Sequence, residues 1–228
     1  VRGAAVPVKF VLWDHDGVLV DTEPLFFEAT ARALADHGVA VSHDRWAALQ
    51  AAGSGIVRLL DEAEGVGVTH AEIRHVRDEI YADLLSQRDV LIPGARRAVE
   101  EISGCYRSVM VTTSLRRYID QIHGQTGLLE HFEHIVTAED CSRRKPHPEP
   151  YLRAMDLIGA TPEACVAIED SPRGFASARA AGVRCVVVRS DFIRSGSFDG
   201  AERVLDRVAQ FGPFLAQLGE AAADSAGF

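Results

Sequence analysis

Apolar residues occur in short runs near the start of the chain and throughout its second half. The first run covers Val8 and Phe10–Trp13 and ends at Asp14. Runs of this length are typical of strands that are buried on both faces of a parallel sheet. Five later runs predict further strands: Ser108–Thr112, Ile135–Val136, Cys165–Ile168, Arg184–Val188 and, at an edge, Val204–Leu205.

The region between Asp21 and Val90 shows no strand pattern, and we expect only helices there. The predicted helices are Leu25–His37, His43–Ala52, Ile56–Glu64 and one that runs from Thr69 to about Leu85. Thr69 and Glu72 have the spacing of a capping box, which is typical of a helix start. After Pro93-Gly94, helices alternate with the strands at Ala95–Ser103, Arg116–Thr126, Pro148–Ile158 and Pro172–Ala181.

This alternation of strands and helices predicts an α/β fold, a Rossmann-like parallel sheet with helices on both faces. The helical block interrupts the sheet after its first strand. We therefore expect a sheet domain made of residues 1–21 and 92–228 and an inserted all-helical domain made of residues 22–91. The small, polar end Gly219–Phe228 is expected to fray.

Composition narrows the class of partner. The chain has 228 residues, of which 47% are hydrophobic, and a formal net charge of −9 without a run of Lys or Arg. These values argue against nucleic acid and against a membrane as partners, but not against a small phosphorylated molecule. Four scattered cysteines, no secretory segment after Val1–Pro7 and no run long enough to span a bilayer predict a cytoplasmic protein. We expect a monomer or a weak homodimer.

Two carboxylates end the first strand, Asp14 and Asp16, and Gly17 follows them. The carboxyl end of a buried parallel strand faces a crevice, where adjacent acids repel each other unless a cation or a catalytic role holds them. Taken alone, a solvated Asp-x-Asp-Gly turn explains the spacing equally well.

Three later stretches would reach the same edge of the sheet. Thr112-Thr113-Ser114 ends the second strand, Lys145-Pro146 lies in a loop, and Glu169-Asp170 follows the apolar run Cys165–Ile168. Hydroxyl and backbone N–H groups can hold phosphate oxygens, and adjacent acids suit a hard cation. Each stretch alone also fits an ordinary turn or surface position. His131 and His134, at i and i+3, fit surface positions better than a metal site.

The wider pattern resembles the haloacid dehalogenase superfamily. DHDGVLVDTE matches its first motif, DxDGxLxD[ST]E, although His15 stands where that family often has Phe, Leu or Met. RRKPHPEPY is similar to the KPxPxxY/F motif, and the segment from Glu169 to Gly174 is similar to the EDSxxG motif. Nearly the whole chain is covered, and the helical block resembles the cap that many members carry after the first motif.

The resemblance implies a role for each matching residue. Asp14 would be the nucleophile and Asp16 the general acid and base, while Lys145 would neutralise the phosphoryl group. Thr112 is the best match to the second motif, within one position, and Thr113 is expected to bind phosphate. The expected cofactor is Mg²⁺, held by Asp14, the backbone carbonyl of Asp16, Asp170 and Glu169, the last one directly or through water.

The expected activity is magnesium-dependent hydrolysis of a small phosphomonoester, such as a sugar phosphate, through a phospho-aspartate. The presence of Asp16 argues against the dehalogenases and phosphonatases of the superfamily. A phosphomutase of the β-phosphoglucomutase type and a non-catalytic phosphate-binding module remain alternatives. Phe26 stands where such mutases have a histidine, and the loop Gln50–Ile56 has no positive charge to hold a second phosphate. Arg77 would compensate only in part.

Overall fold

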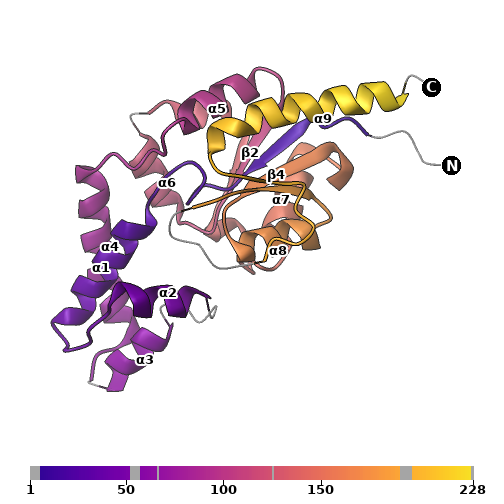
Figure 1. The fold of residues 1–228 in the computed structure, drawn as a ribbon. Helices are drawn as coiled ribbons and strands as arrows, with labels where there is room; N and C mark the ends of the chain where they lie inside the picture. Colours follow the sequence, from indigo (N-terminus) through magenta and orange to yellow (C-terminus); the bar gives the residue numbers. More distant parts are fainter. Residues whose placement is uncertain (1–5, 52–56, 66, 125, 191–196, 227–228) are drawn as a thin grey trace. The chain divides into compact units, whose positions relative to one another are not determined.

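The sheet consists of six parallel strands, among the residues that the structure describes, in the order β3-β2-β1-β4-β5-β6 (Figure 1). The computed structural model describes residues 6–51, 57–65, 67–124, 126–190 and 197–226. The strands are β1 (Phe10–Trp13), β2 (Arg107–Val111), β3 (His134–Val136), β4 (Cys165–Glu169), β5 (Arg184–Val188) and β6 (Arg203–Leu205). All six predicted strands and the α/β class are thereby confirmed, with β6 at the edge.

Helices cover both faces of the sheet. The strands carry apolar side chains on both faces, and these side chains are buried only when helices pack on each face. In β1, Leu12 lies beside Val109 of β2 and Ala167 of β4, in the core that also includes α7 (Glu149–Ile158) and α8 (Pro172–Ala180). Trp13 points to the opposite face. Its ring packs edge-on against Phe211 of α9 (Phe211–Ala226), with the ring centres 5.4 Å apart. Helix α5 (Ala95–Ser103) lies on this second face with α9 (Figure 1).

The strand order reverses beside β1. The chain leaves β1, forms β2 and then β3, linked by α6 (Arg116–His123), and returns to form β4 on the other side of β1. In open α/β sheets, ligands bind at the carboxyl ends of the strands where the order reverses in this way. The fold therefore places its binding edge at the ends of β1 and β4.

Thr22–Val90 form a second compact unit, and the sheet belongs to a unit made of Val1–Asp21 and Leu91–Phe228. In the described part of Thr22–Val90 all regular structure is helical: α1 (Glu23–Ala35), α2 (His43–Ala51), α3 (Val57–Gly65) and α4 (His70–Gln87). The capping box is confirmed, because the Thr69 hydroxyl accepts a hydrogen bond from the Glu72 backbone and the Glu72 carboxylate accepts one from Thr69 N. None of the described helices is long and apolar enough to cross a bilayer.

The chain end, which was expected to fray from Gly219, is helical, because α9, anchored by buried Phe211 and Phe214, continues to Ala226. Arg77 packs within its own unit: its guanidinium lies 4.8 Å from the centre of the Phe26 ring, and its side chain is only 12% exposed. Of the loop Gln50–Ile56, residues 52–56, which include Gly53-Ser54-Gly55, lie outside the described residues.

Candidate active site

Charged side chains are buried at the carboxyl edge of the sheet. Asp14 directly follows β1, Glu169 ends β4 and Asp170 follows it, while Lys145 comes from the loop before α7. Each of these four residues is 7% exposed or less. Ionised groups are almost never buried to this extent unless they are paired or functional, so this edge is the candidate active site.

The ammonium group of Lys145 holds the cluster together. It donates hydrogen bonds to Asp14 Oδ1 at 2.7 Å, to Glu169 Oε1 at 2.7 Å and to the backbone carbonyl of Val111 at 2.8 Å. Burial disfavours the charge on Lys145, but the carboxylates of Asp14 and Glu169 outweigh that effect and raise its pKa above the ordinary value. Lys145 is thus a fully hydrogen-bonded cation between two carboxylates.

The remaining negative charge fits a metal ion. Asp14, Glu169 and Asp170 each offer an oxygen, and these oxygens lie within 4.8 Å of one another. Burial, and then the charge of the neighbouring acids, raises the pKa of Asp14 and of Asp170 well above the ordinary value. One ammonium group does not balance three carboxylates. A hard divalent cation with oxygen ligands, such as Mg²⁺, would offset their repulsion.

Glycine lets the backbone come close to this cluster. Gly17 has a φ of +80°, and a Cβ atom built on it would lie 1.9 Å from Asp170 Oδ2. A Cβ atom built on Gly174, in the first turn of α8, would lie equally close to Glu169 Oε2. Any larger residue at either position would displace a carboxylate of the cluster, so the two glycines shape the site.

Asp16 lies beside this cluster and is more open, with its side chain 36% exposed. Its Oδ2 accepts hydrogen bonds from the hydroxyl groups of Ser114, at 2.7 Å, and of Thr112, at 3.3 Å. Thr112 is buried, whereas Thr113 is exposed. The structure therefore brings Asp14, Asp16, Thr112, Lys145, Glu169 and Asp170 to one edge of the sheet, with Thr113 next to them in the chain.

Sequence reasoning missed two residues that hold these side chains in place. Ser114 was visible only as the last residue of a Thr-Thr-Ser turn, and its contact with Asp16 depends on how β1 and β2 pair. Tyr151 was visible as the last residue of the KPHPEPY match. Its hydroxyl donates to Glu169 Oε1, the oxygen that also accepts from Lys145.

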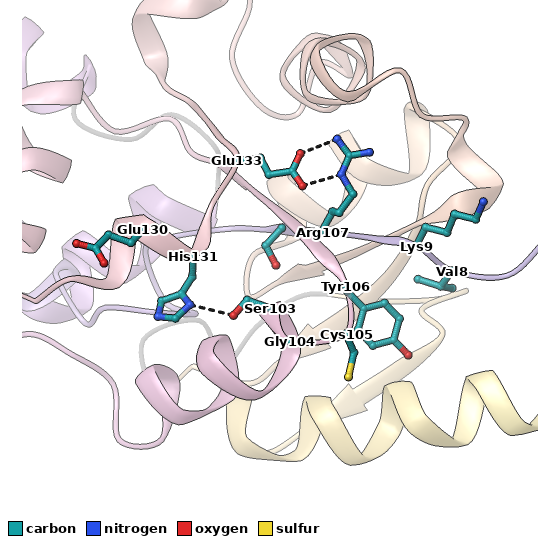
Figure 2. Close-up of a pocket in the computed structure, with 11 residues that line it drawn as sticks. Val8, Lys9, Ser103, Gly104, Cys105, Tyr106, Arg107, Glu130, His131 and Glu133 are labelled. Atoms are coloured by element: carbon teal, nitrogen blue, oxygen red, sulfur yellow. Dashed lines mark hydrogen bonds and ion pairs between the residues drawn. The ribbon is translucent and has the colours of Figure 1, made fainter.

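A cavity lies at the opposite, amino edge of the sheet. It has a volume of about 630 Å³ and is lined by residues before β1 and β3 and by residues before and at the start of β2 (Figure 2). Arg107 pairs with Glu133, and His131 Nδ1 lies 2.9 Å from the Ser103 hydroxyl. These contacts are exposed or only partly buried, and the cavity contains none of the predicted site residues. We therefore take the carboxyl edge as the candidate active site.

Comparison with known proteins identifies the family of this chain. The family model described as haloacid dehalogenase-like hydrolase matches residues 11–188. The chain is 30% identical to protein CbbY of Cereibacter sphaeroides over 90% of this chain and 94% of that protein. It is 28% identical to the phosphorylated carbohydrates phosphatase of Thermotoga maritima, over 77% of this chain and 82% of that one.

A solved structure shows the same fold. A CbbY variant from Rhodobacter sphaeroides, in complex with xylulose-(1,5)bisphosphate, superimposes with a TM-score of 0.78 and 26% identity over 90% of this chain and 96% of that chain. The family match covers most of this chain, and named phosphatases are among its relatives. The chain therefore belongs to the haloacid dehalogenase-like hydrolase family and is a hydrolase.

Proposed function

We propose that this enzyme hydrolyses a small phosphomonoester, in a magnesium-dependent reaction, through a phosphorylated Asp14. The observation that carries the proposal is the buried group of Asp14, Lys145, Glu169 and Asp170, in which one cation is shared by two carboxylates. The proposal is stronger than a motif match because such a cluster is costly to bury without a function.

Each step has an assigned group in this chain. The Asp14 carboxylate attacks phosphorus, the bond to the ester oxygen breaks, and the leaving oxygen takes a proton from Asp16. Asp16, now ionised, takes a proton from water, whose oxygen attacks the same phosphorus. The bond between phosphorus and Asp14 then breaks, which releases phosphate and restores both carboxyl groups. Lys145 offsets the negative charge on Asp14, and the Thr112–Thr113 turn would contact phosphate oxygens.

Asp14, Glu169, Asp170 and the backbone carbonyl of Asp16 would hold the magnesium ion. When bound, this cation supplies positive charge that lowers the repulsion between the nucleophile and the phosphate oxygens. The chain itself excludes water from the nucleophile, because Asp14 is only 7% exposed. Tyr151 and Lys145 keep Glu169 in a fixed orientation through its Oε1 atom.

The proposed substrate is a phosphorylated sugar or a similar metabolite. One relative is named a phosphatase of phosphorylated carbohydrates, and a structural neighbour binds xylulose-(1,5)bisphosphate.

We propose that Thr22–Val90 act as a cap that sets specificity. In that unit Phe26 packs against Trp46 and Tyr81. Its ring has no donor group, so it offers no hydrogen bond to a second phosphate. We also retain the predictions of a cytoplasmic location and of a monomer or weak homodimer.

The test is a screen of phosphorylated metabolites for phosphate release, with magnesium and after exhaustive chelation. We expect release from one or more sugar phosphates that requires the metal and returns when magnesium is added back. Full activity in protein shown by elemental analysis to be metal-free would overturn the metal assignment. Rapid conversion of β-glucose 1-phosphate to glucose 6-phosphate with little free phosphate, followed by phosphorus NMR, would favour a mutase instead.

A further inference from the structure

Two histidines are buried next to Asp16, and the reaction proposed above uses neither. His15 lies between the two aspartates of the first motif and is fully buried, while His123 at the end of α6 is 3% exposed. Their Nε2 atoms are 2.9 Å apart. On its other side, His15 Nδ1 lies 3.3 Å from Asp16 Oδ2 and makes no hydrogen bond of normal geometry within the described part of the chain.

The pair continues to a hydroxyl group. His123 Nδ1 lies 3.1 Å from Thr126 Oγ1, and that oxygen accepts a hydrogen bond from the backbone N–H of Leu128 at 3.1 Å. The single hydroxyl hydrogen of Thr126 can point at His123 Nδ1 or at the His123 carbonyl, which is 3.2 Å away. Burial, and then the nearby His15, lowers the pKa of His123 to about 4, so its imidazole is neutral near pH 7.

When both imidazoles are neutral and Asp16 is ionised, only one direction of donation satisfies this chain of contacts. If Thr126 donates to His123 Nδ1, then His123 Nε2–H donates to His15 Nε2, and the hydrogen of His15 resides on Nδ1, facing Asp16 Oδ2. In the reverse direction a bare His15 Nδ1 would face a carboxylate oxygen, and two acceptors would repel each other.

We propose that His15 is a positioning residue for Asp16, with its tautomer fixed by His123 and Thr126. The proposal rests on the proposed function of Asp16 as general acid and base. His15 Nδ1–H, Ser114 and Thr112 all approach the same oxygen, Oδ2, and together they set the orientation of the carboxyl group. The 3.3 Å separation becomes a hydrogen bond when Asp16 engages substrate, since catalytic hydrogen bonds often tighten only in the complex.

The test compares two esters of similar shape, phenyl phosphate and p-nitrophenyl phosphate, in the presence of magnesium. Phenolate is a poorer leaving group than p-nitrophenolate, so its departure depends far more on a proton from Asp16. We expect His15→Leu to lower kcat/KM for phenyl phosphate at least about tenfold and for p-nitrophenyl phosphate less than about twofold, because a misplaced acid loses part of the 10²- to 10⁴-fold that such catalysis supplies.

His123 provides a second variant that does not touch Asp16. His123→Leu should show the same selective loss, whereas His123→Gln should restore most of the activity, because a glutamine amide can still donate to His15 Nε2. The matched control is His131→Leu, which removes a histidine hydrogen-bonded at 2.9 Å at the amino edge (Figure 2) and should leave both rates unchanged. Folding of each variant is checked by circular dichroism.

The outcomes separate this inference from the proposed function. Wild-type protein that hydrolyses neither this ester pair nor any metabolite would overturn both. An active wild type whose ratio of the two rates is unchanged in the His15 and His123 variants would overturn the inference and leave the proposed function standing. Equal losses on both esters, or no recovery in His123→Gln, would reduce His15 to a packing role and also overturn it.

Discussion

The two edges of the sheet differ in whether their charged side chains are buried or exposed. At the carboxyl edge, Lys145 and Glu169 are buried and hydrogen-bonded to each other at 2.7 Å, with Asp14 on the same ammonium group. At the amino edge, Arg107 and Glu133 form a bidentate pair at 2.6 and 2.7 Å with both side chains exposed. The amino edge also has a cavity, with a volume of about 630 Å³.

The two edges therefore differ in buried charge, and this difference is the reason why the carboxyl edge, rather than the cavity at the amino edge, is the candidate active site. An exposed ion pair gains little, because water already solvates both partners. A buried group of acids must lose that solvation, and it persists only where hydrogen bonds, a metal or a catalytic task offsets the cost. Three experiments test how far the two edges differ.

The largest effect is expected from Asp14→Asn. The amide is isosteric but a far poorer nucleophile, so kcat should fall at least about 10³-fold. The free energy of unfolding without magnesium should stay equal or rise, since one of several repelling acids is gone. Steady-state kinetics and urea unfolding give the two values. Near-normal turnover in this variant would contradict the assigned nucleophile.

Lys145→Met tests the buried cation. Its loss leaves Asp14 and Glu169 without their shared cation, although Tyr151 still donates to Glu169. We expect a loss of about 3–5 kcal/mol in the free energy of unfolding in metal-free buffer, because the remaining charges are buried and uncompensated. The measurement is urea unfolding followed by circular dichroism.

Arg107→Met at the amino edge is the matched control for Lys145→Met. It also removes one cation from an ion pair, but Arg107 is 53% exposed, so the cost should not exceed about 1 kcal/mol. Equal costs for the two variants would show that the two edges do not differ in the way described above.

An effect smaller than that of Lys145→Met is expected when the pH is lowered. Burial, the adjacent His15 and Arg96 lower the pKa of His123 to about 4, against 6.5 for an ordinary histidine, while Asp16 opposes the shift. Between pH 6.5 and pH 4 this histidine therefore binds a proton in the unfolded chain but not in the folded protein. The free energy of unfolding falls as the pH falls from about 6.5 to about 4. At pH 5 the loss should be about 2 kcal/mol relative to pH 7.

His123→Gln removes this titration and should flatten the pH dependence by that amount. Urea unfolding of both proteins at pH 7 and pH 5 measures it, with magnesium absent from all samples. Curves for wild type and variant that fall in parallel would show that His123 is not the group responsible.

Most elements of the fold can be predicted from local patterns in the amino-acid sequence. Short apolar runs such as Phe10–Trp13 are typical of strands in a parallel sheet that is covered on both faces, and such runs predicted all six strands. The capping box at Thr69 was also readable, because its two hydrogen bonds join residues three apart. The helix that continues to Ala226 was missed, since its stability comes from Phe211 and Phe214 packing on distant residues rather than from local propensity.

Of the site, the sequence determined which residues follow β1, β2 and β4, and parallel pairing brings such residues to one edge. Their hydrogen-bond partners become visible only in the folded chain. The sharing of Lys145 by Asp14 and Glu169, the contact of Ser114 with Asp16 and the pairing of His15 with His123 all join residues between 24 and 131 positions apart. Strand order and register set these contacts, and no local pattern in the chain encodes those distances.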